Sequence, residues 1–158
     1  MDEAAKKTAL RWIPYGLFLV GTKDGDKLTC SAVNWLTQAS FAPPLVVFAS
    51  KAGTGTTDMI NASQLFCINV LETGSKDLAS KFFKHVEPEG NKFGDVEFSL
   101  SPNGLPVIKD ALGYFEARVK STYTEGDHTI FIAEVVEAGV QKEGQPMTLS
   151  ETGFFYGG

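Results

Sequence analysis

The chain has 158 residues, of which 43% are hydrophobic and 21% charged, enough apolar material for one domain with one core. Its formal net charge of −5 argues against wholesale binding to nucleic acid, which needs a basic surface. No apolar run approaches the roughly 20 residues that cross a bilayer. The charged N-terminus lacks the apolar core of a signal peptide, so we expect a cytoplasmic protein without membrane contact and a single domain over residues 1–158.

The N-terminal part of the chain predicts a short helix followed by a β-hairpin. Ala, Lys, Leu and Arg favour a helix over residues 2–12, and Pro14 stops it. An apolar strand over residues 17–22 leads into a turn that contains Gly25, and residues 27–33 return as the partner strand.

Residues 29–44 form an unusual stretch, which begins as a strand and ends at a double proline. Between these ends lie Trp35, several hydroxyl side chains and two amides, and we expect residues 34–40 to form a loop. Backbone amides, small polar side chains and one flat ring could bind a planar heterocycle with polar edges. A strand that ends in a polar loop with a core tryptophan is the alternative, and composition alone favours it.

A continuous apolar strand at residues 45–50 leads into a loop rich in glycine and threonine at residues 50–58. Inward-pointing N–H groups, hydroxyls, the Lys51 ammonium and the start of a helix at residues 58–62 could hold one phosphate. A flexible turn with a threonine N-cap explains the pattern equally well. The loop is not a P-loop, because GxxxxGK[ST] is absent, and the helix is too short for a Rossmann crossover.

The middle of the chain predicts one strand, one helix and one long connection. The strand covers residues 65–71, and Ser75 caps a helix over residues 76–84. Residues 86–98 are rich in Pro, Gly and charged side chains, which makes them the best candidate for a mobile flap.

The C-terminal half predicts further antiparallel strands. Residues 114–123 alternate, with Phe115 and Ala117 on one face and Glu116 on the other, which is typical of a half-exposed strand that returns over residues 129–138. Short final strands are predicted at residues 147–149 and 154–156. Many strands, hairpin turns and only short helices together predict an antiparallel β-barrel.

The sequence offers little support for nucleophilic catalysis or a metal site. It contains no GxSxG motif. Cys30 and Cys67 lie in predicted strands without CxxC spacing, so we expect two buried free thiols. Together with His85 and His128 they are scattered over the chain without ligand spacing, and we expect no metal.

Three motifs resemble those of the flavin reductase-like family of FMN-binding split barrels. The first is NWLTQASF at residues 34–41, followed by Pro43-Pro44. The second is GDHT at residues 126–129, and GLP at residues 104–106 matches the approach to it. The resemblance runs from about Leu10 to Tyr156, and the flavoredoxin branch is the most similar.

This resemblance implies a mainly β fold, an antiparallel, Greek-key-like FMN-binding split β-barrel with a few short helices. It implies FMN as the cofactor and NADH or NADPH as the electron donor. The flavin ring and ribityl chain would lie at Asn34, Trp35, Leu36 and Thr37. The phosphate would lie at Ser50, Lys51, Thr54, Thr56 and Thr57. Because this loop has glycines and threonines where the family more usually has Lys-x-Ser-x-Thr, the individual hydroxyl contacts stay open.

The resemblance also places His128 near the nicotinamide or another electron partner, on the open side of the flavin ring. Because hydride transfer needs no proton relay, we expect His128 to affect binding and orientation more than chemistry. From the residues alone, a turn histidine that merely finishes the strand is the alternative. Barrels of this family usually pair with FMN between the protomers, so a homodimer is implied.

The leading hypothesis is therefore an NAD(P)H:flavin oxidoreductase that transfers hydride from a nicotinamide cofactor to FMN. The first alternative is a flavoredoxin-like electron carrier, which keeps FMN tightly bound and passes electrons between protein partners. The second is a non-enzymatic β-barrel module that binds a different ligand. Retention of flavin and the rate of its reduction distinguish these three functions.

Overall fold

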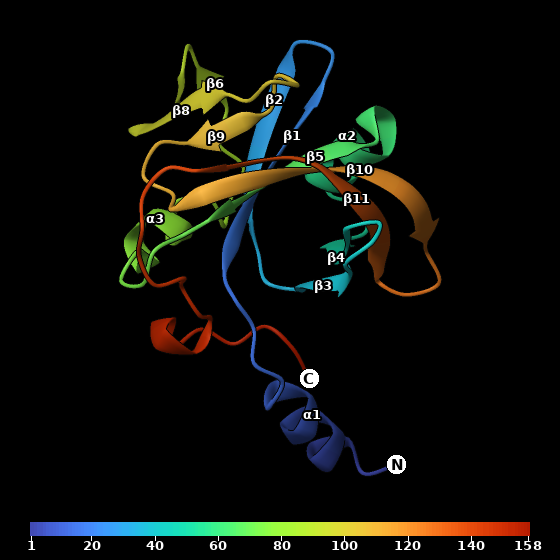
Figure 1. Ribbon diagram of the computed structural model, residues 1–158. Helices are drawn as coiled ribbons and strands as arrows, with labels where there is room; N and C mark the ends of the chain where they lie inside the picture. The colour runs from blue at the N-terminus through green and yellow to red at the C-terminus, as the bar shows by residue number, and fades with distance from the viewer.

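A strongly curved antiparallel sheet of seven strands forms most of the molecule, in the order β2-β1-β5-β10-β11-β4-β3 (Figure 1). The structure is a computed structural model that describes all 158 residues. The strands of this sheet are β1 (Phe18–Asp24), β2 (Lys27–Val33), β3 (Leu36–Ser40), β4 (Leu45–Lys51), β5 (Leu65–Val70), β10 (Gly113–Tyr123) and β11 (His128–Val140). The mainly β, antiparallel prediction is confirmed.

A second, smaller sheet replaces the predicted flap. Its four strands, in the order in which they pair, are β6 (Pro88–Glu89), β7 (Lys92–Phe93), β8 (Val96–Leu100) and β9 (Pro106–Ile108). Phe93, Val96 and Phe98 are buried in a core cluster under this sheet. The prediction of a mobile flap at residues 86–98 is therefore wrong, because these apolar side chains anchor the segment.

The helices are few and short, as predicted: α1 (Glu3–Arg11), α2 (Gly55–Ser63), α3 (Lys76–Ser80) and the 3₁₀ turn η1 (Ser150–Thr152). Asp2 caps α1 by accepting hydrogen bonds from two backbone N–H groups of its first turn. α1 buries none of its residues and extends away from both sheets (Figure 1). None of the helices is long and apolar enough to cross a bilayer.

Aromatic packing inside the curved sheet fixes the position of α2. Phe48 lies 5.2 Å from Phe66 and 6.1 Å from Phe131, measured between ring centroids, and all three side chains are fully buried. Ile60 of α2 is also fully buried in this cluster. Because Ile60 holds the middle of α2 against the sheet interior, the N-terminus of α2 stays beside the end of β4.

Residues 36–40, predicted to be part of a loop, form the edge strand β3, which pairs with β4. The loop prediction relied on small polar residues. Thr37 and Gln38 are exposed on β3, so their polar side chains remain in solvent when the segment forms a strand.

Glu116 does not lie on an exposed strand face, as alternation predicted, but is fully buried. Its carboxylate accepts hydrogen bonds from the backbone N–H and the side-chain amide of Asn103. The pairing of β10 with β11 shifts register between Glu116 and Ala117, which places both consecutive residues inside. A β-bulge of this kind breaks the period of two, and the sequence of one strand does not show it.

The last predicted strands are largely absent. Thr148 forms only an isolated bridge with Gly16, and residues 154–156 belong to no strand. Cys30 and Cys67 are buried and free, as predicted, and burial raises the pKa of both thiols.

Glu151 connects η1 to the loop that follows β5. Its carboxylate accepts hydrogen bonds from the Thr73 hydroxyl and from the backbone N–H groups of Thr148 (2.7 Å) and Gly74 (3.0 Å). These bonds, that of Thr73 first, hold the pKa of Glu151 below its ordinary value.

We expect Glu151→Gln to lower the melting temperature by roughly a few degrees at pH 7, because the amide loses the charge that these donors bind. A carboxyl group with a lowered pKa stabilises the fold above its unfolded pKa, and this contribution disappears as the pH falls through the folded pKa. The difference between wild type and variant should therefore shrink below about pH 4. Thermal melts from pH 7 to pH 3 test this, with Glu143→Gln as control; a difference that does not change with pH would contradict it.

Candidate functional site

A cavity of about 800 Å³, which we call the main cavity, lies at the ends of β2 and β4. One wall comes from residues 31–34 of β2 and the turn after it, residues 49–51 of β4 and residues 54–56 at the start of α2. Residues 82–85 and 154–156 also line the main cavity, and they adjoin β2 and its turn through hydrogen bonds from Ala32 N–H to the Phe82 carbonyl oxygen and from the Asn34 amide to the Tyr156 carbonyl oxygen. The volume of the cavity is within the range of roughly 300–1,000 Å³ that is typical of small-molecule pockets.

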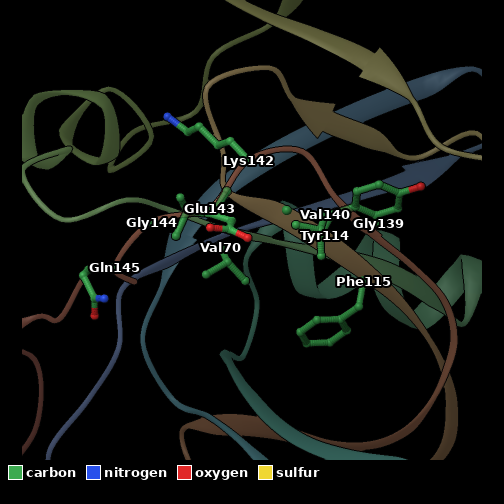
Figure 2. Close-up of a pocket in the computed structure, with 11 residues that line it drawn as sticks. Val70, Tyr114, Phe115, Gly139, Val140, Lys142, Glu143, Gly144 and Gln145 are labelled. Carbon is green, nitrogen blue, oxygen red and sulfur yellow. The ribbon is translucent and has the colours of Figure 1, made fainter.

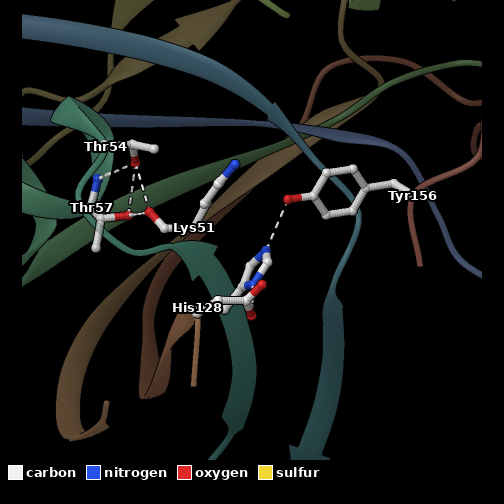
Figure 3. A network of polar contacts seen from close by, with 6 residues as sticks. Lys51, Thr54, Thr57, His128 and Tyr156 are labelled. Carbon is white, nitrogen blue, oxygen red and sulfur yellow. Dashed lines mark hydrogen bonds and ion pairs between the residues drawn. The ribbon is translucent and has the colours of Figure 1, made fainter. Parts of the chain in front are cut away.

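The loop between β4 and α2 is shaped by hydrogen bonds among hydroxyl groups. Thr54 is the N-cap of α2, and its hydroxyl donates to the Lys51 carbonyl oxygen at 2.9 Å. Thr57 Oγ1 lies 2.7 Å from both Ser50 Oγ and the Lys51 carbonyl oxygen, and 3.0 Å from Thr54 Oγ1 (Figure 3). These contacts hold the chain in a turn that presents the N-terminus of α2 to the main cavity.

The donors on this wall suit an anionic group. Lys51 makes no ion pair, and its side chain extends between the threonine cluster and His128 (Figure 3). A Cβ atom added at Gly55 would meet nothing within 4 Å, so the space beside this first residue of α2 is open. The first N–H groups of a helix lack intrahelical acceptors and bind phosphate well. An ammonium, hydroxyls and a helix N-terminus together fit a phosphate group.

The predicted phosphate residues come together here, but they do not have equal access. Ser50, Lys51, Thr54 and Thr56 line the main cavity. Thr57 does not line it, because its hydroxyl is used within the loop. Thr57 therefore maintains the shape of the turn.

The predicted ring residues separate into two groups. Asn34 lines the main cavity and is only 6% exposed. Trp35 lies just behind it, against His128. Leu36 packs against the core and Thr37 is exposed on β3, so the structure brings neither to the main cavity.

His128 lies at the centre of a cluster of aromatic and polar groups. Its ring is 4.3 Å from that of Trp35, between centroids. Nδ1 lies 2.8 Å from a carboxylate oxygen of Asp127, and Nε2 lies 2.9 Å from the Tyr156 hydroxyl oxygen (Figure 3). The indole N–H of Trp35 is buried and has no hydrogen-bond partner.

The surroundings of Asp127 and Tyr156, the two partners of His128, fix their protonation states. The hydrogen bond from His128 holds the pKa of the Asp127 carboxyl below its ordinary value. Burial, followed by the negative charge of Asp127, raises the pKa of Tyr156. At neutral pH the cluster therefore contains an Asp127 carboxylate and a protonated Tyr156 hydroxyl that can donate a hydrogen bond.

Several groups of the site were not found in the sequence. Tyr156 forms hydrogen bonds with Asn34 and His128. His128 is the nearer of these two in the sequence, and more than 20 residues separate it from Tyr156. No local motif announces this contact. Lys84 and His85 also line the main cavity, although Lys84 was assigned to the end of a helix and His85 lies between that helix and the predicted flap.

A second hollow of about 610 Å³ lies on another part of the surface (Figure 2). It is lined by Val70, Tyr114, Phe115, Gly139 and Val140, and its lysine, Lys142, is 2.6 Å from a Glu72 carboxylate oxygen. This hollow has no counterpart of the α2 N-terminus or of the hydroxyl cluster, so the main cavity is the better candidate for a phosphate-bearing ligand. The His, Cys, Asp and Glu side chains form no group of three or more that could hold a metal ion.

Relatives in sequence include proteins of different lengths. The high molecular weight rubredoxin of Moorella thermoacetica is 34% identical over 142 residues, which cover 89% of this chain but only 62% of that protein. Diflavin flavoprotein A 1 of Synechocystis is 30% identical over 85% of this chain and 24% of its own length. The flavin reductase of Pseudomonas putida is 30% identical over 96% of this chain and 87% of its own length.

Solved structures show the same fold. The NADH:FAD oxidoreductase of Streptomyces globisporus C-1027 superposes with a TM-score of 0.79 and 28% identity, covering 89% of this chain and 84% of that one. The flavin reductase HpaC, solved with NADP⁺, also has a TM-score of 0.79, with 25% identity over 99% of this chain and 97% of its own. A family model described as the flavin reductase like domain matches residues 10–158. The chain therefore belongs to the flavin reductase-like family.

Proposed function

We propose that this chain is an NAD(P)H:flavin oxidoreductase that binds FMN in the main cavity and transfers hydride from a nicotinamide cofactor to it. The observation that carries the proposal is the main cavity itself, in which an anion-binding helix N-terminus and the His128 cluster line the same space. Family membership supports the same conclusion. Residues 1–158 are taken as a single flavin-binding domain, because the walls of the cavity come from Leu17 through Tyr156.

In this proposal the phosphate of FMN is held by Lys51, Thr54, Thr56 and the N-terminus of α2. Ser50 and Thr57 keep the loop in its bound shape through the 2.7 Å contact between their hydroxyls. Asn34 lies along the ring, with Trp35 behind it. The bound flavin supplies the hydride-accepting ring, and the protein supplies position, polarity and exclusion of water.

We place the nicotinamide at His128, on the side of the main cavity away from α2. A dinucleotide donor is supported by the relatives, which include an NADH-dependent FAD reductase of Streptomyces globisporus and the NADP⁺ complex of HpaC. The names of these relatives give different nicotinamide cofactors, and only the first names its flavin, which is FAD. FMN, which carries one phosphate, is proposed for this chain because the groups that can bind an anion form one compact set at the start of α2.

The proposed assembly is a homodimer. Phe41 is 91% exposed beside the edge strand β3, and Trp12 is 78% exposed at the end of α1. Large exposed apolar side chains next to an unpaired strand and an unpacked helix fit an interface between two copies of the chain. Light scattering after gel filtration should give twice the mass of one chain.

A second candidate is an electron carrier that retains FMN and exchanges electrons with a protein partner. Two longer relatives favour this function, the high molecular weight rubredoxin and the diflavin flavoprotein. This chain matches only a part of each, so in those proteins a similar domain is joined to further protein segments. The two functions predict different behaviour of the same bound flavin.

The experiment uses protein freed of flavin and reconstituted with FMN. Rapid anaerobic bleaching of the flavin absorbance near ~450 nm by NADH or NADPH, with turnover of added free flavin, supports the oxidoreductase. A flavin that survives gel filtration but is reduced slowly by both nucleotides supports the carrier. If the protein does not bind added FMN, both functions are contradicted, and the remaining candidate is a barrel that binds another ligand.

A further inference from the structure

Residues 154–158, which we call the strap, run across the mouth of the main cavity. The strap leaves η1 at Gly153, whose φ of 74° lies in the left-handed region that favours glycine. Phe154 packs edge-on against Phe83 at 5.1 Å between centroids. At the other end, the Gly157 carbonyl oxygen accepts a hydrogen bond from Arg11 Nε at 3.2 Å. Figure 1 shows this segment passing from η1 towards α1.

No residue of the strap is buried, and the strap is held by contacts of its side chains and not by backbone pairing. Phe154 packs against the core cluster and has Lys76 Nζ 4.6 Å from its ring centroid, and Arg11 Cζ lies 5.3 Å from the ring centroid of Phe155. The residues of the strap belong to no helix or strand and make no backbone–backbone hydrogen bond. Phe155 is 76% exposed and Tyr156 is 46% exposed. Segments with few buried contacts and unpaired backbone open at low free-energy cost.

Tyr156 nevertheless connects the strap to two residues of the site. Its carbonyl oxygen accepts a hydrogen bond from the Asn34 side-chain amide at 3.1 Å. Its hydroxyl lies 2.9 Å from His128 Nε2, and its ring stands edge-on to Trp35 at 5.4 Å.

His128 therefore has no free polar edge while the strap is in place. Nδ1 is paired with Asp127, Nε2 is paired with Tyr156 and one face of the ring lies against Trp35. The side chain is only 10% exposed. A ligand that is to hydrogen-bond His128 must displace Asp127 or Tyr156, and Tyr156 is the one carried by a segment without backbone pairing.

We propose that Tyr156 is a positioning residue that acts through His128, and that the carboxamide of a nicotinamide ring hydrogen-bonds His128 only after the strap has released Tyr156. This inference rests on the proposed function, because it concerns the nicotinamide of that reaction. The apparent affinity for nicotinamide is then lower than the intrinsic affinity, in proportion to the fraction of molecules with the strap open. A second consequence is that strap opening uncovers the indole of Trp35, whose N–H has no partner in the closed state.

The first test follows the strap without any flavin. The chain contains two tryptophans, so Trp12→Phe leaves Trp35 as the only indole emitter. In that background Tyr156→Phe, and more strongly Tyr156→Ala, should make Trp35 fluorescence more easily quenched by acrylamide. Tyr123→Phe is the matched control, since its hydroxyl bonds to Glu125 at 2.6 Å away from the site. Unchanged quenching in Tyr156→Ala would overturn the inference.

The second test measures binding of NAD⁺ and NADP⁺ to the FMN-loaded protein by calorimetry. Loss of one hydrogen bond should shift the strap equilibrium by roughly two- to tenfold, so Tyr156→Phe should tighten nicotinamide binding by up to that factor. The affinity for FMN should stay the same. In a His128→Ala background, Tyr156→Phe should have no further effect, because its hydroxyl acts through His128.

The outcomes separate the two proposals. If the wild type binds neither FMN nor nicotinamide, the proposed function fails and the nicotinamide part of this inference fails with it. If both ligands bind but Tyr156→Phe weakens nicotinamide binding or leaves it unchanged, the proposed function stands and the strap inference alone is wrong.

Discussion

Gly55→Asp should weaken FMN binding by about 100-fold or more, because it puts a carboxylate where the phosphate of FMN is proposed to lie. A Cβ atom at Gly55 points into open space at the first residue of α2, and this residue lines the main cavity. Two like charges about 5 Å apart at an effective dielectric constant near 20 repel by roughly 3 kcal/mol, and a phosphate dianion is repelled more strongly. Fluorescence titration of FMN measures the change.

The same substitution should leave the fold intact. An acidic side chain in the first turn of a helix interacts favourably with the helix dipole, so the melting temperature should stay the same or rise. Gly55→Ala is the matched control, since it adds a methyl group without charge and should change FMN affinity little. A stable Gly55→Asp protein that binds FMN normally would show that the phosphate lies elsewhere.

Lys51→Met should raise the dissociation constant for FMN by about 10- to 100-fold, since hydrogen bonds to charged groups contribute roughly 1.5–3 kcal/mol. Lys51 makes no ion pair, although, after the hydrogen bond from His128, its charge is one of the smaller causes that lower the pKa of the nearby Asp127 carboxyl. Because the Lys51 side chain is exposed, salt should reduce the effect towards the lower limit.

Lys84→Met is the control for this prediction. Lys84 also lines the main cavity, but it lies outside the turn between β4 and α2 that carries the proposed phosphate contacts. If both lysine variants weaken FMN binding equally, the effect comes from general charge and not from a phosphate contact at Lys51. Lys51→Arg should retain most of the affinity, because it keeps a cation at the same position.

Local patterns in the sequence predicted those parts of the structure that depend on neighbouring residues. The helix at residues 2–12, the hairpin of β1 and β2 and the glycine-threonine loop before α2 are each specified by a few adjacent side chains. The two thiols could be placed inside because they interrupt apolar strands. The barrel followed from the number of short strands and turns.

Features that depend on distant pairing could not be predicted in this way. Burial of Glu116 follows from the register between β10 and β11 and from its partner Asn103, and neither is visible in one strand. The role of Tyr156 depends on a segment without secondary structure that folds back onto His128.

The most direct test of the account is a calorimetric titration of the flavin-free chain with FMN and, separately, with riboflavin, which has the same ring and no phosphate. We expect one FMN per chain and an affinity for FMN at least about tenfold higher than for riboflavin, because the cradle at α2 binds the phosphate. Equal affinities for the two flavins, or no heat with either, would contradict the claim that this cavity is built around a flavin phosphate.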